Sequence, residues 1–233
     1  MPGKLAQKVT KLWNHSALAK YAVGTFSFMS IADHYLVPSR NMLTYYDAPI
    51  EEHPFAFEKN VEYLILVSDD GNPYTSGDEN IKKLARETGL DGEHFHVELY
   101  IDGLFYSARY GEVAQARTLD QIQTLFPGSE YIIKEIDIPN EDLSISWFNK
   151  HKRGTVYDVQ ENNCSLTVTG MLEAGAYTKK IIPISVSDFK KKNPFVMQKL
   201  QQENFAFKVN ELIFPDQFDV YGNFVYKGKL ADK

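Results

Sequence analysis

An Asp-Gly pair between two stretches of alternating polarity is the strongest local constraint on how this chain folds. Asp102 and Gly103 follow the stretch HFHVELYI and precede the stretch LFYSARY. Asp-Gly is a preferred two-residue turn of a β-hairpin, and here it pairs Ile101 with Leu104. The sequence therefore predicts an antiparallel hairpin over residues 94–110, in which the strand period of two assigns each side chain to one of two faces.

The two faces of this predicted hairpin differ in polarity. One face is almost wholly apolar and is expected to pack in the core; it carries Phe95, Val97, Leu99, Ile101, Leu104, Tyr106, Ala108 and Tyr110. The other face mixes polar and aromatic side chains; it carries His96, Glu98, Tyr100, Phe105, Ser107 and Arg109. Such a mixture suits the wall of a cleft, and the alternative is a solvent-facing strand with an incidental histidine.

The chain's single cysteine stands at the start of another predicted element. Asn162 and Asn163 precede Cys164, and the apolar run after it ends at Ala174. Asparagine is favoured at the N-cap of a helix, so this pair places Cys164 in a first helical turn. There the helix dipole and the unpaired backbone N–H groups stabilise a thiolate, and the Cys164 N–H can help hold an oxyanion. The alternative interpretation is a buried structural cysteine, since free cysteine is among the most buried residue types.

A thiol at a helix start and a histidine on an upstream strand are typical of a nucleophile and its base. An imidazolium beside Cys164 lowers the thiol pKa further and protonates the leaving group, which makes His96 the candidate base. His94 and His96 also have a spacing that can bind zinc, but no third ligand has motif support. We therefore expect neither a metal nor a cofactor. The sequence also contains no phosphate-binding glycine loop, dinucleotide fingerprint or Gly-x-Ser-x-Gly elbow.

Three stretches, taken in this order, resemble a known family. Residues 96–103 (HVELYIDG) are similar to its His-Val-x-hydrophobic-Tyr-hydrophobic hairpin. Residues 157–175 are similar to its Tyr…Asn-Cys-Ser segment with a helix and a closing glycine, and residues 182–189 (IPISVSDF) to its later proline-containing turn into a helix. The family is the circularly permuted NlpC-type branch of the papain-like thiol hydrolase superfamily, which includes relatives of lecithin:retinol acyltransferase. In its permuted members the histidine strand precedes the cysteine helix, as it does here.

The resemblance implies an α+β fold in which a twisted antiparallel sheet packs on a helix that carries the cysteine at its N-terminus. On this basis residues 61–233 form a permuted papain-like hydrolase domain that ends in a C-terminal hairpin around Gly222 and Asn223. Residues 1–60 form an N-terminal helix and loop extension. The extension and the C-terminal hairpin have no counterpart in the family pattern.

The resemblance also implies roles for the two main residues of the site. Cys164 is the nucleophile and His96 is the base, so catalysis needs no cofactor. Asn163 and Asn162 are the residues expected to cap the helix beside the oxyanion.

A third polar residue usually orients the imidazole in this family, from the strand after the histidine. In this chain that position falls on Ser107, where the family more often has histidine, asparagine or an acid. Glu98, on the same face as His96, is the alternative. Arg109 is a poor orienter, because a neighbouring cation disfavours the protonated histidine.

The implied activity is hydrolysis of an amide bond through an acyl-enzyme, by a Cys-His dyad or triad. Peptidoglycan stem peptides are the commonest substrate of the bacterial relatives, so the leading hypothesis is a peptidoglycan amidase or endopeptidase. Such a protein is expected to be a secreted antibacterial effector, with a cognate inhibitor or immunity protein as its partner. Two alternatives stay open: a thiol acyltransferase, lipid esterase, deamidase or isopeptidase acting on lipid or protein, and an inactive binding module that retains the fold.

Composition limits the partners and the compartment. The chain has 233 residues, a net charge of -6 and an isoelectric point near 5.5, which disfavours nucleic acid because phosphate binding needs a basic face. One cysteine makes no internal disulfide and no signal peptide is recognisable, so we expect a protein that is cytoplasmic when made and secreted, if at all, by another route. A lysine-bearing amphipathic helix is predicted at 4–21; we expect it to pack on the core, with membrane contact as the minority interpretation.

Overall fold

The computed structural model describes residues 48–68, 94–109, 111–158, 160–192, 197–198, 201, 206–213 and 215–229. The predicted helix at 4–21 and most of the predicted extension 1–60 lie outside these residues, as do Tyr110 and the side chains of His94 and Phe95. Within the described ranges, no helix has both the length and the apolar character needed to cross a membrane.

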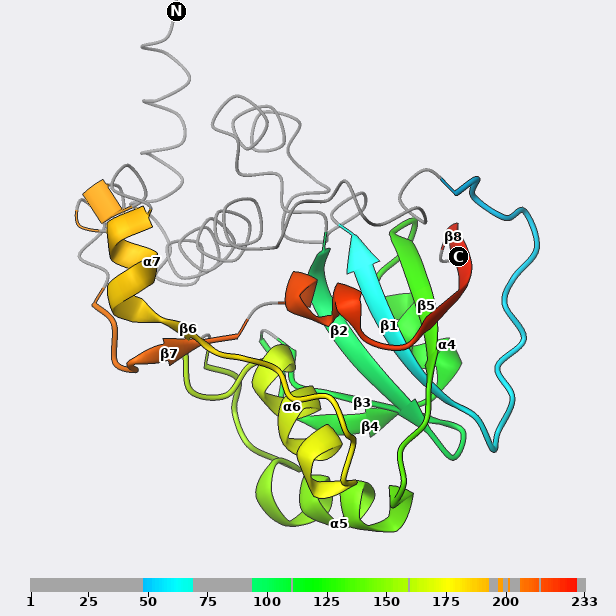
Figure 1. Ribbon diagram of the computed structural model, residues 1–233. Helices are drawn as coiled ribbons and strands as arrows, with labels where there is room; N and C mark the ends of the chain where they lie inside the picture. The colour runs from blue at the N-terminus through cyan, green and yellow to red at the C-terminus, as the bar shows by residue number, and fades with distance from the viewer. Residues whose placement is uncertain are drawn as a thin grey trace, which may run out of the picture.

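The described residues form an α+β fold around a six-stranded sheet in which all neighbouring strands are antiparallel. The strands are β1 (Glu62–Ser68), β2 (His94–Ile101), β3 (Leu104–Ser107), β4 (Gln115–Arg117), β5 (Glu130–Ile136) and β8 (Asn223–Lys229). Their order across the sheet is β4-β3-β2-β1-β5-β8 (Figure 1). The predicted α+β class and antiparallel sheet are therefore confirmed.

Helices lie on both faces of this sheet. The helices of the described residues are α4 (Leu119–Leu125), α5 (Glu141–His151), α6 (Cys164–Ala174), α7 (Val186–Lys192) and the 3-10 helix η2 (Pro215–Val220), of which α6 and α4 lie on opposite faces of the six-stranded sheet and α7 lies beside β6 (Ile184–Ser185). A second sheet joins β6 to β7 (Glu211–Leu212). α6 packs on β2 and β3, and α5 packs on α6, while α4 contributes Ile122 to the core on the opposite face (Figure 1). The helix that begins with the cysteine thus rests on the predicted hairpin.

The hairpin forms in its predicted register. Ile101 pairs with Leu104, and the turn residues Asp102 and Gly103 have φ angles of 47° and 85°. Glycine adopts positive φ at no steric cost, and aspartate tolerates it better than most residues do. This dipeptide therefore closes the hairpin as the sequence predicts.

A β-bulge lies near the start of β2. Val67 of β1 pairs with His96, and the next pair joins Ser68 to His94, so one residue of β2 between them has no partner. Bulges bend a strand and re-aim its side chains. His96 is consequently the first residue of β2 after the bulge, and from it onward the pairing with β1 is regular.

The face of the hairpin predicted to be apolar is a core, as expected. Val97, Leu99 and Ile101 are fully buried and belong to one cluster with Phe148 of α5 and Val168 of α6. Each apolar side chain removed from water in this layer contributes roughly 1.5–3 kcal/mol. The contact between the sheet and the two helices is therefore an ordinary hydrophobic interface.

The opposite face is a second core, and the prediction of a cleft wall or a solvent-facing strand is wrong. His96 is 4% exposed, and Glu98 and Ser107 are fully buried. The cover comes partly from the segment before β1 and partly from α4, which sequence periodicity does not place. The aromatic side chains of this second core come from the strands and from their cover, and they include Phe55, Phe57, Tyr63, Tyr100, Phe105, Phe126 and Tyr131.

The predicted C-terminal hairpin around Gly222 and Asn223 is also wrong. The residues before Gly222 form η2, and those after it form β8, which pairs with β5 at the edge of the sheet. Phe218 of η2 is fully buried, which anchors this helix on the core of the sheet. Gly222 has a φ of 68° and lies so close to the carbonyl oxygen of Glu135 that a Cβ there would clash with it. The glycine therefore marks a helix-to-strand corner and not a hairpin turn.

Candidate functional site

The N-terminus of α6 places Cys164 where the sequence predicts it. Asn163 is the N-cap, with extended backbone, and its side-chain oxygen accepts a hydrogen bond from the Leu166 N–H at 2.8 Å. Cys164 is the first residue of the helix. A first-turn N–H has no acceptor within its own helix, so the N–H of Cys164 can serve an oxyanion.

Asn162 does not cap the helix. Its side-chain nitrogen donates to the Thr155 hydroxyl at 2.8 Å and to the Val156 carbonyl at 2.6 Å, and its side-chain oxygen accepts from Lys152 Nζ at 2.9 Å. These bonds close the loop between α5 and α6. Asn162 therefore stabilises the loop that leads into the helix, and Asn163 is the residue that caps it.

The thiol of Cys164 and the imidazole of His96 interact directly. Both side chains are almost wholly buried, and a hydrogen bond joins them. Nε2 of His96 pairs with Oε1 of Glu98 at 2.7 Å. Since this contact occupies Nε2, Nδ1 is the ring nitrogen left to donate to the sulfur.

The pKa of His96 is raised although the ring is buried. Burial by itself lowers it, but the negative charges of Cys164 and Glu98 and the hydrogen bonds to them raise it to about 9. An imidazole with this pKa is protonated at neutral pH.

The pKa of Cys164 moves in the opposite direction. Burial raises it, and this is outweighed by the charge and hydrogen bond of His96, with further help from the Val97 N–H and the Ser165 hydroxyl. Each of the two groups therefore stabilises the charged form of the other.

The end of the β2–β3 ladder explains why the Val97 backbone is available to the sulfur. The ladder stops at the pair of Leu99 and Tyr106. Beyond it the Val97 N–H donates to Cys164, and the Ser107 hydroxyl donates to the Val97 carbonyl at 2.8 Å. Ser107 therefore supports the backbone of the histidine strand.

Of the two residues that the sequence left open for the third position, Glu98 is the one that meets the imidazole, whereas the Ser107 hydroxyl bonds the Val97 carbonyl. Glu98 lies two residues after His96 on the same strand face, and one carboxylate oxygen meets Nε2. Its other oxygen, Oε2, has no hydrogen-bond partner among the residues that the structure describes. A buried carboxylate held chiefly by one imidazole strongly favours the protonated ring.

The guanidinium of Arg109 is held by partners other than His96. It sits 4.9 Å from the centre of the Phe126 ring and donates to Glu112 Oε1 at 3.0 Å and to the Leu125 carbonyl at 3.1 Å. The Phe126 ring in turn lies 5.0 Å from the His96 ring, centre to centre. Phe126 and Glu112 are thus parts of the surroundings that sequence reasoning missed, although a carboxylate three residues after Arg109 is a recognisable pairing signal.

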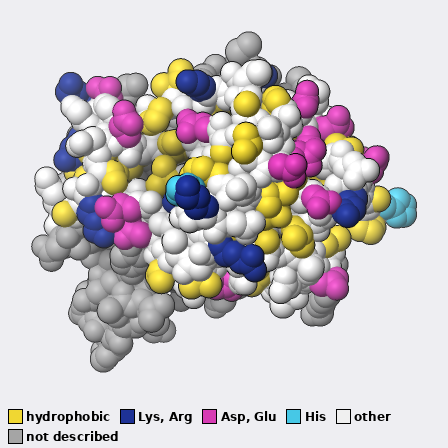
Figure 2. All heavy atoms as spheres, turned by 90° about the horizontal axis from the view of Figure 1, so that it is seen from below, with side chains coloured by type: hydrophobic (Ala, Val, Ile, Leu, Met, Phe, Trp, Pro, Cys, Tyr) yellow, Lys and Arg dark blue, Asp and Glu magenta, His cyan; other side chains and the backbone are white. Residues whose placement is uncertain are grey.

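No metal centre is visible in the described part of the chain. No group of three or more His, Cys, Asp and Glu side chains is arranged there to hold a metal ion. Figure 2 shows one face of the molecule, on which the coloured acidic and basic side chains are scattered among apolar ones.

The chain stands apart in comparisons with known proteins. No protein-family model, no curated protein and no solved structure matches it.

Proposed function

We propose that this protein is a cysteine hydrolase of the permuted NlpC-type, papain-like kind, which cleaves an amide bond through an acyl-enzyme. One observation carries the proposal: the first residue of α6, Cys164, is hydrogen-bonded to His96, whose other ring nitrogen is held by Glu98. Nucleophile, base and orienter follow one another in the arrangement that covalent catalysis requires.

In the proposed reaction, Cys164 begins as a thiolate and His96 as an imidazolium. The Cys164 thiolate attacks the carbonyl carbon of the amide, and the oxyanion forms beside the backbone N–H of Cys164. The imidazolium of His96 donates its proton to the leaving nitrogen as the C–N bond breaks, which leaves a thioester and a free amine. Neutral His96 then takes a proton from water, whose oxygen attacks the thioester and releases a carboxylic acid and the thiolate.

The first test is the pH dependence of Cys164 alkylation by iodoacetamide. We expect the thiolate to form well below the ordinary thiol pKa of about 8.5, and to form at higher pH in His96→Ala. His151→Ala, an exposed histidine on α5, is the matched control and should leave the titration unchanged. An ordinary thiol pKa that does not depend on His96 would mean a structural cysteine and would sink the proposal.

The hydrolytic rate should fall as pH rises through about 9. At that pH His96 loses the proton that it donates to the leaving group, so the rate has an alkaline limb there. A rate that keeps rising above pH 10 would contradict the assignment of His96 as the acid.

The substrate that we propose to test first is peptidoglycan, in keeping with the family that the sequence resembles. Incubation with wild-type protein should release new amino and carboxyl termini from muropeptides, and Cys164→Ala should release none. If the protein is an antibacterial effector, cells that produce the wild type should outcompete target bacteria in a competition assay, and cells that produce Cys164→Ala should not. Absence of muropeptide release by a protein whose thiol is activated would move the proposal to lipid or protein acyl groups.

A further inference from the structure

The imidazole of His96 is bound at its edge, which leaves its faces to packing. Its two nitrogens meet the sulfur of Cys164 and, at 2.7 Å, Oε1 of Glu98. Ring N–H donors lie in the plane of the imidazole. These bonds place the two nitrogens, but the ring can still tilt about the line that joins them. Whatever packs against a face therefore decides how firmly the ring keeps its plane.

The phenyl ring of Phe126 packs against the imidazole. The two ring centres are 5.0 Å apart and the ring planes differ by 36°. At this separation two rings are too close to lie side by side in one plane, so their faces overlap in part. Phe126 is 1% exposed and His96 is 4% exposed. Water therefore has little access to the contact.

The end of α4 fixes the position of Phe126. This residue is the C-cap of the helix, and its backbone N–H donates to the Ile122 carbonyl at 3.1 Å. Its own carbonyl accepts from the Ser129 N–H at 3.2 Å. Pro127 follows and cannot continue a helix. The phenyl ring is thus positioned by an element that lies outside the hairpin and the cysteine helix.

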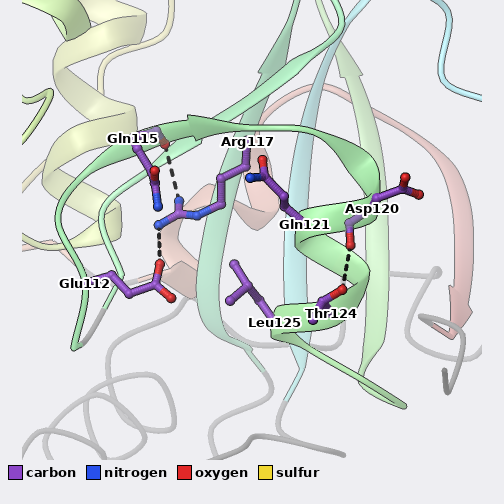
Figure 3. Close-up of a pocket in the computed structure, with 7 residues that line it drawn as sticks. All are labelled: Glu112, Gln115, Arg117, Asp120, Gln121, Thr124 and Leu125. Atoms are coloured by element: carbon purple, nitrogen blue, oxygen red, sulfur yellow. Dashed lines mark hydrogen bonds and ion pairs between the residues drawn. The ribbon is translucent and has the colours of Figure 1, made fainter.

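Arg109 holds the same ring from another element. Its guanidinium lies 4.9 Å from the centre of the Phe126 ring, and it donates to the Leu125 carbonyl at 3.1 Å and to Glu112 Oε1 at 3.0 Å. The other oxygen of Glu112 accepts from Arg117 at 2.8 Å, and Glu112, Leu125 and Arg117 line a pocket between β4 and α4 (Figure 3). These bonds tie Arg109 to the last turn of α4, beside Phe126.

The contact has an electrostatic consequence for His96. The face of a phenyl ring is electron-rich and attracts a cation that lies within about 6 Å of its centre, most strongly where water is excluded. The imidazole of His96 lies within this range. When the thiolate attacks, the sulfur loses its negative charge, while the imidazolium keeps its proton until the leaving nitrogen takes it. The phenyl face supports the positive charge during that interval.

We infer that Phe126 is a positioning residue for His96: the face of its ring keeps the imidazole in the plane of its two hydrogen bonds and stabilises the imidazolium. This inference rests on the role proposed for His96 in the hydrolase. It adds to the site a side chain from α4.

The test is an NMR titration of His96 in the full chain with Cys164→Ser, where no thiolate lies beside the imidazole. Comparison with His96→Ala assigns the signal. We expect Phe126→Leu to lower the pKa of His96 by about one unit. A trifluorinated phenylalanine at position 126 should lower it as well, because fluorine withdraws electron density from the ring face. This second variant keeps the shape of the ring, so it tests the inference even where Phe126→Leu fails to fold.

Phe105→Leu is the matched control. Phe105 is also 1% exposed and belongs to the same core, where its ring meets Phe57 and Tyr100. The control removes the same atoms from the core and should leave the titration of His96 unchanged. An equal shift in Phe105→Leu would mean a general loosening of the core. A wild-type titration with the fluorinated ring would mean that the ring face does not act on the charge. Either result overturns the inference.

Alkylation of Cys164 in the wild-type background separates this inference from the hydrolase proposal. We expect Phe126→Leu to slow alkylation at pH 7 severalfold, since a less basic His96 stabilises the thiolate less. An ordinary thiol pKa in the wild type, with the NMR shift intact, would overturn the hydrolase and support the ring contact. An activated thiol without the NMR shift would overturn the role of Phe126 and support the hydrolase.

Discussion

The two faces of β2 bury alternate side chains of one strand, and they are stabilised in different ways. Toward α6, Val97 and Leu99 fill space among other apolar groups. On the opposite face His96 and Glu98 are as deeply buried, and they are held by a hydrogen bond to each other beside a wall of aromatic rings. Shape complementarity governs the first face, whereas on the second each ionisable group depends on a partner. The comparison predicts that substitutions of the apolar side chains on the first face change stability, and that substitutions of the ionisable side chains His96 and Glu98 on the second change the state of the thiol.

The largest expected effect is on the apolar face. Leu99→Ala should lower the free energy of unfolding by about 2–5 kcal/mol, because Leu99 is fully buried and its removal leaves a cavity. Urea unfolding followed by circular dichroism measures the loss. The thiolate titration of the folded fraction should stay as in the wild type. Ile182→Ala, at a residue 79% exposed, is the control and should stay within about 0.5 kcal/mol.

Glu98→Gln should change the reactivity of the thiol more than it changes the stability of the fold, which is the reverse of the result expected for Leu99→Ala. Removing the carboxylate charge lowers the pKa of His96 below about 9 and raises that of Cys164, so alkylation at pH 7 should slow about tenfold for each unit of pKa change. The imidazole titration is read by NMR and the thiol by alkylation. Glu135→Gln, at an exposed position of β5, is the matched control. Unchanged alkylation kinetics in Glu98→Gln would show that Glu98 does not influence the ionisation of Cys164. They would also contradict the proposed difference between the two faces of β2.

Ser107→Ala separates the two candidates for the third position. The variant loses the hydrogen bond to the Val97 carbonyl, which should cost about 1 kcal/mol of stability. Alkylation kinetics should stay within about twofold of wild type, since the hydroxyl meets the backbone and not the imidazole. A loss of reactivity as large as that of Glu98→Gln would show instead that Ser107 orients His96.

The smallest effect is expected at the exposed end of the hairpin. Lys59 and Asp102 form an ion pair of 3.2 Å, but both side chains are more than half exposed. Lys59→Ala should therefore change the free energy of unfolding by about 0.5 kcal/mol or less, and added salt should remove even that difference. A loss above 1 kcal/mol would mean that Lys59 supports the aromatic face through its stem.

Local patterns predicted the parts of the site that depend on neighbours in sequence. The Asp102-Gly103 turn predicted the pairing of Ile101 with Leu104, and the asparagine before the cysteine predicted the helix start at Cys164. Both are confirmed because turn and cap preferences are set within a few residues. The same patterns did not decide whether Ser107 or Glu98 contacts the imidazole of His96, because both lie on the same face of the hairpin as His96.

Long-range packing overruled the sequence patterns in two places. The polar and aromatic face of the hairpin resembles a cleft wall until the Phe57 ring is placed against Tyr100 and Phe105. The segment before Gly222 resembles a strand until Phe218 is seen buried against the sheet. In both cases the contacts join residues far apart in the chain, and no local periodicity encodes them.

The sequence by itself thus determined the hairpin, the capped cysteine helix and the pairing of a thiol with an upstream histidine as a hypothesis. Only the tertiary structure decided which partner holds the imidazole, since the Ser107 hydroxyl turns to the Val97 carbonyl while the Glu98 carboxylate reaches Nε2. It also decided that Arg117 is buried beside Glu112 and lines a pocket. The physical reason is that hydrogen-bond partners and burial depend on distances between elements, whereas turns and caps depend on the backbone preferences of adjacent residues.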